Sequence, residues 1–147
     1  MTIDPTNPIV QLCAEGMNLE GEGKSTEAAE TFMRAWDMAT SHYEQFIAAH
    51  YVARHQHSVT AKLQWDLQAL EAASKVGNEE ITGAYPSLYL NIAKCYEDLG
   101  EYETARQNYE TALSFNASLS EDGNGKMIKS GILAGLARIA DEKKRQI

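Results

Sequence analysis

The chain has 147 residues, of which 44% are hydrophobic and 23% are charged, and its formal net charge is −8. This composition is typical of a folded globular protein, and the acidic balance argues against nucleic acid as a partner, because nucleic-acid binders usually present a basic surface to phosphates. The sequence also has no export signal and no apolar run of the roughly 18 residues that a membrane helix needs, so we expect no membrane partner and a cytoplasmic location.

Apolar residues spaced three and four positions apart dominate the sequence, which predicts helices throughout and no strand. The first helix is expected from Pro8 to about Glu20, with Asn7 or Thr6 as its N-cap, and the second over about 25–40. Further helices are expected over the ranges 42–55, 58–75, 86–99, 102–115 and 126–143. Gly, Asn, Asp and Ser cluster in 77–85 and in 116–126, which predicts two loops, the second with a flexible Gly123–Lys126 linker.

Two segments of the chain can be laid over each other, and they read GEGKSTEAAETFMRAW and DLGEYETARQNYETAL. Each has a glycine that ends a helix and then a small residue, an aromatic residue and an alanine, in that order. These are Gly23, Ala28, Phe32 and Ala35 in the first segment, and Gly100, Ala105, Tyr109 and Ala112 in the second. Small residues let two antiparallel helices approach closely, and the aromatic ring fills the space beside them.

This pattern resembles the tetratricopeptide repeat, a helix-turn-helix unit of ~34 residues. The segment 86–117 is the better copy, whereas the middle pair keeps Ala61 and Trp65 but has Gln68 in place of the expected alanine. The resemblance implies an all-α fold, in which antiparallel helix pairs stack as a short right-handed superhelix within a single domain, 1–147. Its repeats would be about 8–41, 42–76 and 86–117, with a capping helix at about 126–143. A plain helical bundle is the alternative.

In this family the first helices of the pairs line a concave groove that holds a peptide or a partner's helix. The resemblance therefore implies a non-enzymatic adaptor for protein–protein interaction. Helix geometry selects the side chains that would face such a groove: Tyr43, Phe46, His50, Arg54, Asn91, Lys94 and Arg138. Because apolar and positively charged residues are combined, we expect a partner with a hydrophobic anchor and an acidic group.

Two alternatives apply to these groove residues. Phe46 belongs to the core if the register of the helix 42–55 shifts by one residue. Arg54 and Lys94 are ordinary surface charges if they pair with neighbours such as Glu97 or Asp98.

The sequence shows no pattern typical of an enzyme, a cofactor site or a metal site. Four histidines crowd into one stretch: His42, His50, His55 and His57. His50 and His57 would lie ~10.8 Å apart along a helix, too far to share one zinc ion. The two cysteines, Cys13 and Cys95, sit in amphipathic helices, where buried thiols usually serve packing.

Two other functions are kept as alternatives to the adaptor. One is a structural protein that forms a homodimer through the ends of the helical stack or through the long helix 58–75. The other is a metal-binding helical enzyme that uses the stretch from His42 to His57.

Overall fold

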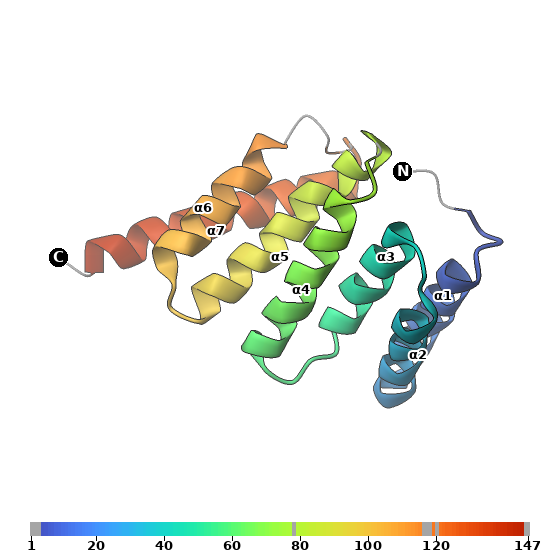
Figure 1. The fold of residues 1–147 in the computed structure, drawn as a ribbon. Helices are drawn as coiled ribbons and strands as arrows, with labels where there is room; N and C mark the ends of the chain where they lie inside the picture. Colours follow the sequence, from blue (N-terminus) through green and yellow to red (C-terminus); the bar gives the residue numbers. More distant parts are fainter. Residues whose placement is uncertain (1–3, 78, 116–118, 120, 146–147) are drawn as a thin grey trace. The chain divides into compact units, whose positions relative to one another are not determined.

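The computed structural model describes residues 4–77, 79–115, 119 and 121–145 (Figure 1). Within these ranges the chain forms α-helices and one 3₁₀ helix, and no strand. The helices gather into two compact units, Met1–Asn78 (unit 1) and Glu79–Ile147 (unit 2). None of the described helices is long and apolar enough to cross a lipid bilayer.

Unit 1 consists of two helix pairs, which match the ranges expected from the sequence to within a few residues. The first pair is α1 (Pro8–Gly21) with α2 (Ser25–Met38), and the second is α3 (His42–Ala53) with α4 (Val59–Ser74). The helices of each pair pack against each other, and α3 also contacts both α1 and α2. This is the arrangement of consecutive helix-turn-helix units.

Polar side chains fix where three of these helices begin. The Asn7 side chain accepts hydrogen bonds from the backbone N–H groups of Ile9 and Val10, as a predicted N-cap should. Ser41 forms a capping box with Glu44 at the start of α3, and Ser58 caps α4. Each cap satisfies backbone N–H donors that have no partner inside the helix. The residues that determine where these helices begin are therefore close to the helix starts in the sequence.

The core of unit 1 forms where an aromatic ring meets a glycine. A Cβ atom added at Gly16 of α1 would lie only 2.3 Å from Cε1 of Phe32 on α2, so the ring fills the space that glycine leaves. Phe32 is fully buried and stacks on Tyr51 of α3, with ring centroids 5.0 Å apart. Trp36 and Trp65 meet edge to face at 5.0 Å and connect α2 with α4. The small-and-aromatic pattern of the repeat thus holds α1 to α4 together.

Unit 2 begins with η1 (Glu79–Ala84), a 3₁₀ helix in a segment where the sequence predicted a loop. It continues with α5 (Tyr85–Asp98), α6 (Tyr102–Ser114) and α7 (Gly123–Arg145). The flexible linker predicted at Gly123–Lys126 is wrong, because these residues form the first turn of α7. The Asp122 side chain accepts a hydrogen bond from the Gly125 N–H at 3.0 Å and so stabilises this turn despite its glycines. Residues 116–118 and 120 of the same predicted loop lie outside the described residues.

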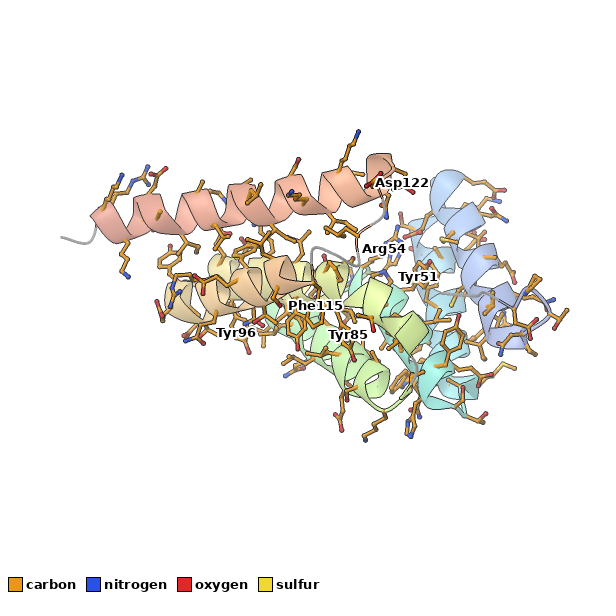
Figure 2. All side chains as sticks on the ribbon, turned by 90° about the horizontal axis from the view of Figure 1, so that it is seen from above. Tyr51, Arg54, Tyr85, Tyr96, Phe115 and Asp122 are labelled. Atoms are coloured by element: carbon orange, nitrogen blue, oxygen red, sulfur yellow. The ribbon has the colours of Figure 1, made fainter. Side chains whose placement is uncertain are left out.

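The core of unit 2 repeats the contact seen in unit 1. Tyr109 of α6 is fully buried, and a Cβ atom added at Gly135 of α7 would lie 2.2 Å from its Cζ. At the C-terminal end of α6, Phe115 stacks on Tyr85 of α5 with ring centroids 5.1 Å apart (Figure 2). It also stacks on Tyr89 of the same helix, at 6.0 Å. Aromatic contacts therefore fasten α6 to both of its neighbours.

The turns within the two best repeat copies have the same geometry. Gly23 and Gly100 have φ angles of +77° and +80°, in the left-handed region that a residue with a side chain avoids. Both glycines lie between the paired helices and allow the chain to reverse. The sequence prediction that these glycines end their helices is confirmed.

Candidate partner-binding face

The first helices of the two pairs in unit 1 leave one side uncovered by α2 and α4. We call this surface the α1–α3 face and define it by six exposed or half-buried residues: Val10, Ala14, Met17, Tyr43, His50 and Arg54. The first three lie three or four positions apart on α1, so they share one side of that helix. Met17 is 43% exposed although it is a large apolar side chain. The face therefore offers apolar surface to solvent.

Arg54 ends α3 and is held by an acidic side chain from α1. Its Nη2 atom donates a hydrogen bond to Oε1 of Glu20 at 3.1 Å, and His55 Nε2 lies 2.7 Å from the other carboxylate oxygen. The guanidinium also lies over the ring of Tyr51, 5.4 Å from its centroid (Figure 2). The Arg54 side chain is still 46% exposed. Its positive charge therefore reaches solvent, but Glu20 already offsets much of it.

His50 carries no charge at neutral pH. Its ring meets Tyr51 edge to face, with centroids 5.1 Å apart. Burial, followed by the positive charges of Arg54 and Lys62, lowers the pKa of His50 from 6.5 to about 4. His50 therefore adds an uncharged aromatic surface to the α1–α3 face, in place of the positive charge that we expected from the sequence.

Two side chains close to the exposed residues of this face are themselves buried. Phe46 is 6% exposed, as in the alternative that assigns it to the core, and Cys13 is 3% exposed. A partner at the α1–α3 face would therefore meet the side chains around them. Burial also raises the pKa of the Cys13 thiol to about 11, so at neutral pH it is protonated and a poor nucleophile.

The three remaining predicted residues lie on α5 and α7 of unit 2. Asn91 is half-buried. Lys94 pairs with Asp98 one turn further along α5. Arg138 of α7 donates two hydrogen bonds to Glu97 of α5, at 2.7 and 3.1 Å. Both positive charges thus have a carboxylate partner, and for Lys94 this partner is one that the second sequence alternative named.

Glu97 is the centre of a polar contact that joins the three helices of unit 2. It also accepts a hydrogen bond at 2.7 Å from the hydroxyl of Tyr109. Burial raises the pKa of Glu97, but the hydrogen bonds from Arg138 and Tyr109 and the nearby positive charges outweigh burial and leave the pKa below 4.5. Glu97 is therefore ionised at neutral pH and holds α5 to α6 and α7.

The equivalent positions of Glu20 and Glu97 in their repeats were not predicted from the sequence. Both follow the small residue of a first helix, Gly16 or Ala93, by four positions. Each accepts hydrogen bonds from a basic side chain that comes from the first helix of the next pair or directly follows it. Their common spacing from the small residue can be read from the sequence, but their basic partners lie far away along the chain, so the sequence alone did not reveal the two pairs.

A shallow polar hollow lies in each unit. The hollow in unit 2, of about 390 Å³, is bordered by Glu97, Tyr102, Arg138 and Asp141, among others. The hollow in unit 1, of about 240 Å³, lies at Trp36, His42, Gln45 and Gln68. Neither combines a nucleophile with a base, and both are lined mainly by hydrophilic side chains.

Among the residues that the structure describes, no three histidine, cysteine or acidic side chains lie close enough together to hold one metal ion. His55 contacts Glu20, while His50 contacts Tyr51, so these two histidines have different neighbours. Cys13 belongs to unit 1 and Cys95 to unit 2, and both are free, buried thiols.

The seven predicted groove residues are thus divided between the two units. Tyr43, Phe46 and His50 lie on α3 of unit 1 and Arg54 is the C-cap of that helix, whereas Asn91, Lys94 and Arg138 belong to α5 and α7 in unit 2. Their action as one binding groove stays a prediction.

Comparison with known proteins bears on the fold. The family model described as "Tetratricopeptide repeat" matches residues 86–119. The fold is similar to that in the crystal structure of PcrH from Pseudomonas aeruginosa, with a TM-score of 0.57 and 18% sequence identity over 95% of this chain and 96% of that chain. No curated protein sequence matches the chain. The predicted all-α fold of antiparallel helix pairs is confirmed: residues 86–119 match the tetratricopeptide-repeat model, and the chain shares its helical fold with PcrH.

Proposed function

We propose that the chain is a non-enzymatic adaptor that binds a protein or peptide partner on the α1–α3 face. The observation that carries this proposal is the exposure of Met17, 43%, beside Val10 and Ala14 on the side of α1 next to α3. A protein partner gains affinity by removing such apolar surface from water. The tetratricopeptide-repeat fold, which typically serves protein interaction, supports the same conclusion.

The chemistry of the face favours a partner with an apolar anchor. His50 is neutral at pH 7, since its pKa lies at about 4, and together with the half-buried Tyr43 it contributes aromatic surface from α3. An acidic group of the partner would reach Arg54, but it would compete there with Glu20. We therefore assign the main contribution to the apolar contacts and a smaller one to Arg54.

In unit 2 we propose that Asn91, Lys94 and Arg138 add polar contacts to a further segment of the same partner. Lys94 and Arg138 each have an intramolecular carboxylate partner, so these contacts exchange one ion pair for another. Such an exchange adds selectivity more than affinity.

Peptides selected by display on the purified protein would test the proposal, with affinities measured by calorimetry. Met17→Glu introduces a charge on the α1–α3 face, and Met33→Glu is the matched control on α2, at a methionine that is 37% exposed. We expect Met17→Glu to weaken binding at least tenfold, about 1.4 kcal/mol, and Met33→Glu to leave it unchanged.

Circular dichroism of both variants would confirm that the helices are retained. Arg54→Ala should weaken peptides with an acidic group by only about threefold, because an exposed ion pair contributes little. Equal affinities of the wild type and Met17→Glu for every selected peptide would refute the assignment of this face.

A further inference from the structure

The last helix of unit 2 presents an apolar side that no described residue of the unit covers. Ile132, Gly135 and Ile139 of α7 are buried in the unit. The opposite side carries six exposed residues, which we call the α7 patch: Met127, Ser130, Leu133, Ala134, Ala137 and Ala140. Met127 is 68% exposed and Leu133 is 47% exposed. The patch contains no charged residue.

The spacing of the α7 patch makes it complementary to itself. If two α7 helices run antiparallel about a two-fold axis that passes between Leu133 and Ala134, these two residues face each other across the axis. Ser130 then lies level with Ala137 of the other copy, and Met127 lies level with Ala140. At each level a large side chain meets a small one, or two small ones meet, so the helices can approach closely.

The same antiparallel arrangement also brings opposite charges together at the two ends of the patch. Lys126 and Asp141 are both exposed and border the patch at its first and last turns. The two-fold axis that pairs Leu133 with Ala134 places Lys126 level with Asp141 of the second copy. Two opposite-charge contacts would therefore form, one at each end of the interface. A parallel arrangement would place Lys126 level with Lys126, and like charges would oppose it.

We propose that two copies of this chain associate through the α7 patch, with their α7 helices antiparallel. This surface belongs to unit 2 and is separate from the α1–α3 face, so the inference does not depend on the proposed function. The patch extends ~20 Å along the helix, at 1.5 Å per residue. One helix face of this length buries an area at the low end of specific interfaces, so the dissociation constant should be on the order of 10 μM.

Sedimentation equilibrium of the purified chain between ~1 and ~200 μM, concentrations that bracket this constant, tests the dimer. We expect the average mass to rise from that of a monomer toward that of a dimer. Ala137→Glu places one acidic side chain from each copy close to the axis and should abolish the rise. Met38→Glu, at an exposed methionine at the end of α2, is the matched control and should dimerise like the wild type.

A charge-reversal pair tests the orientation of the helices. Lys126→Asp and Asp141→Lys should each weaken the dimer about fivefold, and the double variant should restore it, because the pair meets across the interface. A monomer at every concentration, or a dimer unaffected by Ala137→Glu, would overturn the proposal. A dimer that the double variant does not restore would overturn the antiparallel arrangement. Peptide binding by Ala137→Glu should equal that of the wild type, which separates this test from that of the α1–α3 face.

Discussion

Stability of unit 1 should fall in mildly acidic solution because of His50. In the folded chain its pKa is about 4, whereas an unhindered histidine has a pKa of 6.5. Between these two values the unfolded chain binds a proton at this position and the folded chain does not. Protonation therefore favours unfolding, so the stability contributed by neutral His50 is complete above pH 6.5 and is lost as the pH falls toward 4.

The size of this effect follows from the difference between the two pKa values. At ~1.4 kcal/mol per pKa unit, the full loss is about 3 kcal/mol. About 2 kcal/mol of it should occur between pH 7 and pH 5, where few carboxylates change their charge. This amount is large against the total stability of a small domain.

Urea denaturation followed by tryptophan fluorescence would measure this loss. Both tryptophans, Trp36 and Trp65, belong to unit 1 and touch each other, so their emission reports on this unit. His50→Gln removes the titrating ring but also its contact with Tyr51, so the quantity to compare is the difference in unfolding free energy between pH 7 and pH 5. We expect this difference to shrink by about 2 kcal/mol in the variant.

His57→Gln serves as the control, because it removes a histidine of the same stretch whose side chain is exposed rather than packed against a neighbouring ring. This variant should keep the pH dependence of the wild type. An equal loss of stability in the wild type and in His50→Gln would refute the conclusion that His50 is held neutral by burial and by the charges beside it.

Two further predictions concern unit 2 and can be measured by urea denaturation followed by circular dichroism. Gly135→Ala should destabilise the chain by about 1–2 kcal/mol, since its Cβ would lie 2.2 Å from the buried ring of Tyr109 and the clash exceeds the gain in helix propensity. Gly131→Ala would place its Cβ 3.2 Å from Cδ2 at the end of the Leu90 side chain, which can shift more easily than a buried ring, so it should cost clearly less than Gly135→Ala; equal losses would contradict the packing. Glu97→Gln should cost about 1 kcal/mol at pH 7, because its hydrogen bonds from Arg138 lose their charge and water partly screens them. Unchanged stability would show that Glu97 does not hold the helices together.

Much of the fold could be predicted from the sequence because it depends on local patterns. Apolar spacing predicted the helices, and Asn7, Gly23 and Gly100 marked where helices begin and end. The prediction was wrong where a single interaction outweighed the local composition. Gly123–Lys126 has the composition of a linker, yet Asp122 caps it as the first turn of α7. Composition alone does not include this contribution from a single hydrogen-bonding side chain.

The candidate site could be predicted only in outline. Helix geometry placed Tyr43, His50 and Arg54 on one side of a helix, and the structure leaves them exposed or half-buried there. It left open whether Phe46 faces the groove or the core, and it did not predict that His50 is neutral. The burial and the pKa of a side chain depend on the residues that neighbouring helices place around it. They cannot be read from the sequence of one helix alone.

The sequence by itself determined that the chain is helical, where its turns lie, and which small and aromatic residues join the helices of a pair, since all of these depend on residues within one repeat. Only the tertiary structure decided which charges are offset. Arg54 meets Glu20 across 34 positions of the sequence, and Arg138 meets Glu97 across 41. Such pairs form because folding brings distant helices within a few ångströms of each other, and an electrostatic interaction depends on that distance rather than on sequence separation.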